Sequence, residues 1–171
     1  MSPVFCYIDK LNQDDWADME ELEKKIRNLL KGRIVYMGIG NILRGDDGIG
    51  PHLVEVLRKR GASVVDAGTV PESYIGPVTR LEPETIVLVD AVHLGSEPGS
   101  VELLERDEIL KHNCFSTHNL SPVLVMERLE NETGASVFML AIQPATLELG
   151  ASISPAVNLL LTTLPDLLPG M

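Results

Sequence analysis

The spacing of hydrophobic residues changes repeatedly between the period of a strand and the period of a helix. Compact apolar runs predict buried strands at 33–38, 62–66, 85–90 and 135–142. Apolar residues that recur every three or four positions predict helices at 48–60, 119–132 and 154–168. Residues 100–105 alternate with a period of two, which is typical of an edge strand with one face toward water. This alternation of strands and helices predicts an α/β fold with a largely parallel sheet and helices on both faces.

The first thirty residues predict a separate amphipathic helix. Acidic residues follow Asn12 in its first turn, and basic residues lie near its end. Its apolar residues recur at helical spacing and predict one continuous stripe, made of Trp16, Met19, Leu22, Ile26, Leu29 and Leu30. The stripe fits an extra helix packed on the core, and it also fits a helix that docks on a partner. We therefore divide the chain into a helical extension at 1–31 and one domain at 32–171.

Length, composition and charge narrow the classes of function. The 171 residues, of which 44% are hydrophobic and 23% charged, fit one soluble domain with a substantial core. A formal net charge of −11 disfavours nucleic acid and anionic membranes as partners. Cys6 and Cys114 are too few for a disulfide framework, and no apolar stretch approaches the roughly 20 residues that span a bilayer. We expect a cytoplasmic protein with reduced thiols.

Acidic residues lie where the predicted strands end. Asp66 and Asp90 each close an apolar strand, and the strand at 33–38 leads into a glycine-rich loop with the pair Asp46-Asp47. The carboxyl ends of parallel strands meet at one edge of a sheet, where ligand sites usually form. An Asp at the end of a buried strand is costly to desolvate unless a hydrogen bond, a cation or a metal compensates it. Asp66, which precedes Ala-Gly, also fits a simple Asx-type turn.

One histidine extends this set of polar residues. His118 lies among small polar residues directly before a predicted helix, where a side chain can reach the same crevice. Asp47, Asp90 and His118 together offer two oxygen ligands and one nitrogen ligand, with coordination positions left for ligands from outside. Nickel and zinc are metals that accept such an open set. Whether the three residues meet depends on the fold.

The glycines after the first strand also suggest a dinucleotide-binding loop. Gly38 and Gly40 follow a strand as that fingerprint requires, but Leu43 stands where a third small residue is needed. The two adjacent acids would repel a pyrophosphate at the helix entrance. Asp66 could serve as the ribose-binding acid, so this alternative stays open. Otherwise we expect Gly38 and Gly40 to let the backbone turn tightly beneath the site, with Asn41 bonded to the same loop.

Four segments carry a resemblance to a known family. The loop after the first strand reads Met37-Gly-Ile-Gly-Asn-Ile-Leu-Arg-Gly-Asp-Asp-Gly-Ile-Gly-Pro51. It is followed in order by Val65-Asp-Ala-Gly-Thr69, Leu88-Val-Asp-Ala91 and Thr117-His-Asn-Leu-Ser121. In this order and spacing the segments resemble the [NiFe]-hydrogenase maturation endopeptidases. Three shorter segments are most similar to the hydrogenase-3 (formate hydrogenlyase) branch of that family: Val70-Pro-Glu-Ser73, Glu97-Pro-Gly-Ser100 and Ile142-Gln-Pro144. The resemblance covers residues 33–168.

The resemblance implies both a fold and an activity. The fold is a three-layer α/β/α sandwich around a five-stranded, mostly parallel sheet. The activity is that of an endopeptidase that removes a C-terminal extension from a hydrogenase large-subunit precursor after nickel insertion, so the substrate supplies the nickel. Asp47, Asp90 and His118 match the metal-contacting positions of the family, and Asp66 matches a further acid near the site. A factor that inspects the metal centre without cutting the chain would use the same residues, and it is the alternative.

Overall fold

A six-stranded sheet forms the centre of the computed structural model, which describes residues 13–112, 115–116 and 121–170. The strands are β1 (Ile34–Ile39), β2 (Ser63–Gly68), β3 (Thr85–His93), β4 (Val101–Leu104), β5 (Phe115–Ser116) and β6 (Ser136–Ile142). Five of them form a continuous path in the order β2-β1-β3-β6-β4, parallel except for β4, and β5 pairs antiparallel with the end of β3. The mostly parallel, five-stranded sheet of the predicted α/β fold is confirmed.

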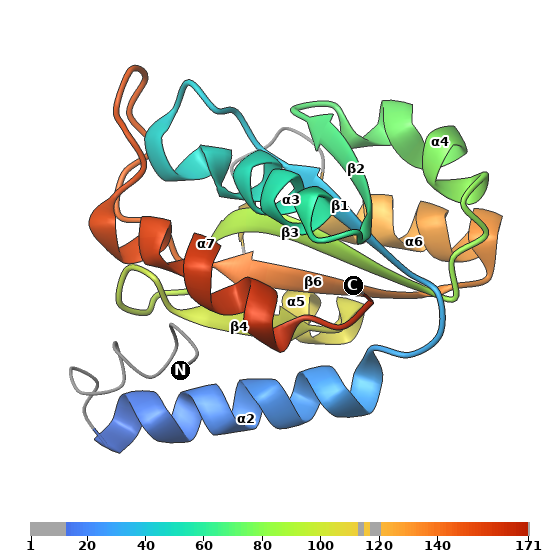
Figure 1. Ribbon diagram of the computed structural model, residues 1–171. Coiled ribbons are helices and arrows are strands. Elements are labelled where there is room, and N and C mark those ends of the chain that lie inside the picture. The colour runs from blue at the N-terminus through green and yellow to red at the C-terminus, as the bar shows by residue number, and fades with distance from the viewer. Residues whose placement is uncertain (1–12, 113–114, 117–120, 171) are drawn as a thin grey trace.

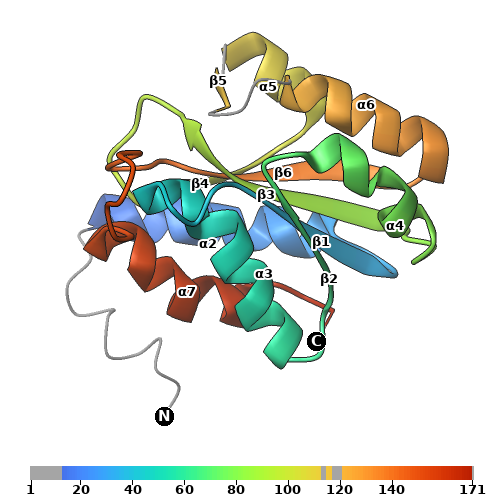
Figure 2. The same cartoon turned by 90° about the horizontal axis from the view of Figure 1, so that it is seen from above.

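Helices cover both faces of this sheet. They are α2 (Gln13–Leu29), α3 (Ile49–Lys59), α4 (Ile75–Thr79), α5 (Arg106–His112), α6 (Pro122–Thr133) and α7 (Pro155–Leu167), with 3₁₀ turns η2 (Gly45–Gly48) and η3 (Pro71–Tyr74). Helices α2, α3 and α7 contribute to the hydrophobic cluster on one face, and α4, α5 and α6 to the cluster on the other. The two views in Figures 1 and 2 show these outer layers with the sheet between them. In the described part of the chain no helix is long and apolar enough to cross a membrane.

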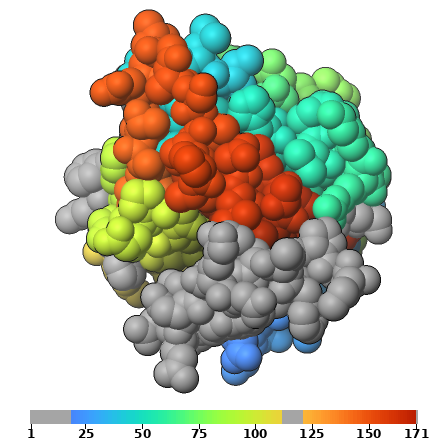
Figure 3. Space-filling view, turned by 60° about the vertical axis from the view of Figure 1, so that its left-hand side comes forward, coloured from blue at the N-terminus to red at the C-terminus, as the bar shows by residue number. Residues whose placement is uncertain are grey.

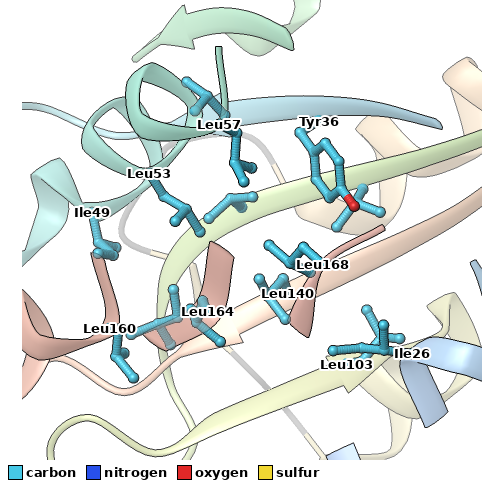
Figure 4. Close-up of a cluster of buried hydrophobic side chains, with 14 of the residues drawn as sticks. Ile26, Tyr36, Ile49, Leu53, Leu57, Leu103, Leu140, Leu160, Leu164 and Leu168 are labelled. Carbon is cyan, nitrogen blue, oxygen red and sulfur yellow. The ribbon is translucent and has the colours of Figure 1, made fainter. Parts of the chain in front are cut away.

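The larger hydrophobic cluster joins α3 and α7 to the sheet. Leu53 and Leu57 of α3 and Leu164 of α7 lie in this cluster on the same face of the sheet, and all three are fully buried (Figure 4). Tyr36 of β1 is buried in the same cluster, and its hydroxyl group donates a 2.6 Å hydrogen bond to the carbonyl oxygen of Pro169. Its hydroxyl bond therefore anchors the chain directly after α7 to the central sheet.

Helix α2 packs on the core, as one of the two interpretations of its apolar stripe predicts. Leu22, Ile26 and Leu30 are buried in the cluster that also contains Leu103 of β4. Figure 4 shows Ile26 beside Leu103, and Figure 1 shows α2 running along the β4 edge of the sheet. The amino group of Lys25 adds an ion pair of 2.9 Å to Glu108 of α5. The part of the stripe from Leu22 to Leu30 is therefore packed against this chain itself.

The elements differ from the predicted ones in several places. Strand β4 lies at the edge of the sheet as predicted, but neighbouring Leu103 and Leu104 are both buried because helices cover both faces there. Helices α4 and α5 were not predicted, since segments of 5 and 7 residues are too short for a clear period. Helix α6 begins at Pro122, after an N-cap at Ser121.

Candidate active site

The loop between β1 and α3 places Asp47 in the interior. Gly40 has a φ of +141°, and a Cβ atom added to it would lie 1.7 Å from the carbonyl oxygen of Asp47. The backbone N–H of Asn41 donates a 2.9 Å hydrogen bond to Oδ2 of Asp47, and the Asn41 side chain accepts one from the N–H of Leu43. The predicted roles of Gly40 and Asn41 in a tight loop are confirmed. Asp47 is only 3% exposed as a result.

Helix α3 begins directly against Ile39 at the end of β1 and Val89 within β3. A Cβ atom on Gly50 would lie 2.2 Å from the carbonyl oxygen of Ile39 and 2.4 Å from that of Val89. Gly38 lies within β1 rather than in the turn, and a Cβ atom there would lie 2.5 Å from the carbonyl oxygen of Gly50. Its expected role in turning the backbone was wrong, because it allows the close approach of α3 instead. The turn η2, which carries Asp47, consequently contacts β3.

Asp46 links this loop to the loop that precedes α7. Its side chain is fully buried. Oδ2 accepts hydrogen bonds from the N–H groups of Ala145 and Thr146, at 2.7 and 3.2 Å, and Oδ1 accepts one of 2.6 Å from the N–H of Ser154. The backbone N–H of Asp46 in turn donates to the carbonyl oxygen of Thr146. The two acids of the pair therefore have different surroundings, which their adjacency in the sequence did not reveal.

Asp90 lies on the central strand β3 and is 1% exposed. Residues two positions apart in a strand share a face. Asp90 therefore shares the face of Leu88 and Val92, which belong to the cluster beneath α6. The strands on either side of β3, β1 and β6, run parallel to it and end at the same edge of the sheet. The structure thus brings the segments that contain Asp47 and Asp90 together at the carboxyl edge of the sheet, as the strand pattern predicted.

Asp66 has a more exposed position at the same edge. It lies on β2, the outer strand next to β1, where it is paired in register with Gly38. The side chain is exposed, and Oδ1 accepts a 3.1 Å hydrogen bond from the N–H of Gly68. This is the Asx-type turn that the sequence offered as the simpler explanation of Asp66.

His118 lies outside the described residues. Among the residues that the structure does describe, no group of three or more His, Cys, Asp or Glu side chains forms a metal site. The described strand β5 comes close to the histidine in sequence: Ser116 pairs with Val92, and Phe115 pairs with His93. Ser116, two residues before His118, is thus paired with Val92 of β3, two residues after Asp90.

Gln143 was noted only as part of the segment Ile142-Gln-Pro144 and was not predicted to lie at the site. It directly follows β6 at the carboxyl edge and is 7% exposed. Its Oε1 accepts hydrogen bonds from the N–H groups of Leu94 and Gly95, and its Nε2 donates to the carbonyl oxygen of Pro144. The side chain therefore holds the segment after β3 against the end of β6. Its position directly after a buried strand is the signal that could have identified it.

Comparison with known proteins places this arrangement in a family. The sequence profile of the HycI hydrogenase maturation proteases matches residues 50–168. This chain belongs to the hydrogenase maturation protease family. The resemblance noted in the sequence and the prediction of a peptidase are therefore confirmed.

Individual relatives of the protease agree with this assignment. The hydrogenase 3 maturation protease of Escherichia coli K12 is 34% identical over 113 residues, which are 64% of this chain and 72% of the relative. The crystal structure of the [NiFe] hydrogenase maturation protease HycI from Thermococcus kodakarensis is 30% identical, with a TM-score of 0.75 over 86% of this chain and 95% of that one. A crystal structure of the hydrogenase 3 maturation protease gives a TM-score of 0.69 at 28% identity, over 78% of this chain and 86% of that one.

The protease has no phosphate cradle at the position that a dinucleotide would need. In that class of protein the pyrophosphate lies at the N-terminus of the helix after the first strand. Here the corresponding turn, η2, contains the buried acids Asp46 and Asp47. Their negative charge opposes a phosphate, so the dinucleotide alternative is not supported.

Proposed function

We propose that this protease removes a C-terminal extension from a [NiFe]-hydrogenase large-subunit precursor after nickel has been inserted. The observation that carries the proposal is the pair of buried acids, Asp47 and Asp90, on segments that contact one another at the carboxyl edge of the sheet. Relatives named as hydrogenase 3 and hydrogenase 2 maturation proteases support the choice of substrate. The cytoplasmic location expected from the sequence is part of the same proposal.

Asp47, Asp90 and His118 are proposed to contact the nickel that the precursor carries. Two carboxylates and an imidazole leave coordination positions for ligands from the precursor, and borderline metals accept this combination. The pairing of Ser116 with Val92 supports the inclusion of His118.

Recognition through buried acids would make nickel a condition of binding. The fold itself already buries both carboxylates, and a buried carboxylate is costly unless a hydrogen bond or a cation compensates it. A precursor with nickel would bring such a cation to Asp47 and Asp90, whereas a precursor without nickel would not. Specificity of this kind comes from a penalty on the wrong substrate rather than from additional contacts with the right one.

For the cleavage itself, the proposal requires an activated water molecule and no serine or cysteine nucleophile. The nickel of the substrate could polarise the scissile carbonyl group. Asp47 and Asp66 are the two acids proposed as a general base. Asp66→Asn separates the two, because Asp66 is exposed and outside the buried pair. A rate within about threefold of wild type would assign the base to Asp47, whereas general base catalysis by Asp66 predicts a loss of about 100-fold or more.

The surface beside Asp47 is suited to a protein substrate. Ile42, Leu43 and Leu149 are 58%, 63% and 73% exposed. They come from two loops that are hydrogen-bonded to each other, since the N–H of Gly150 donates to the carbonyl oxygen of Leu43. Figure 3 shows the loop before α7 beside the loop that follows β1. A precursor that reaches Asp47 with its nickel would cover this apolar rim, made of Ile42, Leu43 and Leu149.

The decisive experiment uses intact mass spectrometry on a hydrogenase large-subunit precursor with and without nickel. We expect loss of one C-terminal peptide from the nickel-loaded form alone. Asp90→Asn should abolish cleavage without unfolding the protein, whereas Asp166→Asn, which removes a surface partner of Arg60, should cleave normally. Wild-type rates with Asp90→Asn would refute the metal-recognition role. A precursor that binds but stays uncut with the wild-type protein would favour the non-cutting assembly factor.

A further inference from the structure

We propose that Asp46 is a positioning residue, which holds Asp47 in place by fixing the loop before α7 to the loop after β1. The consequence for catalysis rests on the proposed function, but the coupling itself does not. No part of the proposed recognition uses Asp46, although it is a fully buried acid. Its three acceptor bonds all go to one segment, residues 145–154, more than ninety positions away in sequence.

The two loops form one hydrogen-bonded unit around Asp46. Beyond the bonds to its carboxylate, the N–H of Gly45 donates to the carbonyl oxygen of Ala151, and the N–H of Gly150 donates to that of Leu43. A carboxylate offers two oxygen atoms that only accept, so it satisfies N–H groups on both sides. Hydrogen bonds to a charged group are also stronger than those between neutral groups.

The unit extends directly to Asp47. The N–H of Asp47 donates a 3.1 Å bond to the carbonyl oxygen of Arg44, and its Oδ2 accepts from the N–H of Asn41. Asp47 follows Asp46 in the chain, so a shift of Asp46 toward solvent would carry the next peptide with it. The loop before α7, which contains no ligand of the proposed nickel site, thereby determines where Asp47 lies.

An asparagine cannot replace Asp46 in this arrangement. Its amide group has one oxygen atom and one NH₂ group, so the NH₂ group must face either Ser154 or the pair Ala145 and Thr146. At least one of the three acceptor bonds is lost, and two donors are brought together. Asp46→Asn is therefore expected to loosen the connection while it preserves the size of the side chain.

The first test is hydrogen–deuterium exchange on the protein alone. In Asp46→Asn we expect the amide of Asn41, which reports on Asp47, to lose about tenfold in protection together with the amides of Ala145 and Ser154. Thr85→Val is the matched control, because Thr85 is a buried residue whose hydroxyl group bonds to Lys31 at the opposite end of β3. Unchanged exchange at Asn41 in Asp46→Asn, or an equal loss in Thr85→Val, would overturn the proposal.

The second test measures cleavage of nickel-loaded precursor. Displacement of a reacting group by about 1 Å costs about 100-fold in rate, so kcat/KM of Asp46→Asn should fall by that order at a temperature where the fold is intact. A rate that falls no further than that of a Thr85→Val variant with the same loss in Tm would overturn the positioning role. If wild-type protein cleaves no precursor, the proposed function fails, while the exchange test still decides the coupling.

A second pair of variants removes one bond without changing Asp46. Ser154 has a φ of −68°, which proline adopts, and Ser154→Pro deletes the N–H that donates to Oδ1 of Asp46. It also deletes the hydroxyl group that caps α7 by accepting from the N–H of Val157, so Ser154→Ala is the control for the lost cap. We expect Ser154→Pro to lose about tenfold more Asn41 protection than Ser154→Ala, as for one hydrogen bond to a charged group. Equal exchange in the two variants would contradict the role of Asp46.

Discussion

Gly40→Ala should inactivate the protease by displacing Asp47. The added Cβ atom would lie 1.7 Å from the carbonyl oxygen of Asp47, whereas real Cβ atoms essentially never approach within 3.0 Å of such an atom. The two atoms must therefore separate by at least 1.3 Å, the difference between these distances. A displacement of about 1 Å at a reacting group costs about 100-fold in rate. We expect kcat/KM for nickel-loaded precursor to fall by at least about 100-fold. Intact mass spectrometry of the precursor at successive times measures this rate.

The change also costs stability, so the assay needs a control with similar strain. A φ of +141° suits glycine, and an alanine there costs about 1–3 kcal/mol. Gly134→Ala provides the comparison, because Gly134 ends α6 with a φ of +70° and its Cβ atom would meet nothing within 4 Å. For a chain of this length each kcal/mol lowers Tm by about 2–4 °C. Both variants should melt earlier, and only Gly40→Ala should lose activity. Wild-type cleavage by folded Gly40→Ala would refute the reasoning that Asp47 must stay where this loop holds it.

Three further changes test the apolar rim, the centre of the sheet and the helical extension. Leu149→Asp should raise KM for the precursor about tenfold with little change in kcat, because a buried contact at an interface is worth more than about 1 kcal/mol. Leu124→Asp, at a leucine of α6 that is 55% exposed, should not raise KM, and equal effects of the two changes would exclude the rim as a contact. Burial raises the pKa of Tyr36 above its ordinary value of 10.0. As the pH rises, the unfolded chain therefore loses this proton at a lower pH than the folded chain does. The contribution of Tyr36 to the free energy of unfolding is fully present below about pH 10 and falls above it, by up to about 1.4 kcal/mol per pH unit. Tyr36→Phe should lower the free energy of unfolding at pH 7 by about 1 kcal/mol through the lost bond to Pro169, and should flatten this alkaline decline in urea titrations. An unchanged decline would mean that other groups cause it. Ile26→Ala should lower the free energy of unfolding by about 2–5 kcal/mol in the same urea titrations, because Ile26 is 1% exposed. A loss below about 0.5 kcal/mol would show that α2 is not part of the cooperative fold.

The sequence determined the order of most elements and the edge at which the acids gather. Buried strands of a parallel sheet are nearly continuous apolar runs, so β1, β3 and β6 were visible without a structure. Because connections between parallel strands have a fixed direction, Asp47 and Asp90 had to come to the same edge. The motifs around them were specific enough, taken in order, to indicate the family that the comparisons confirmed. These properties depend on local periodicity and on residue type, which the chain carries in one dimension.

Only the tertiary structure decided what the individual acids do. Asp46 and Asp47 are neighbours in the sequence, yet one receives three N–H groups from residues 145–154 and the other faces Asn41. Asp66 resembled Asp90 as an acid at the end of a strand, but β2 lies at the edge of the sheet and leaves Asp66 exposed, whereas β3 lies at the centre and buries Asp90. Strand order and contacts between distant loops set the burial and the hydrogen bonds of a carboxylate. Neither can be read from local spacing, because both depend on which segments meet once the chain has folded.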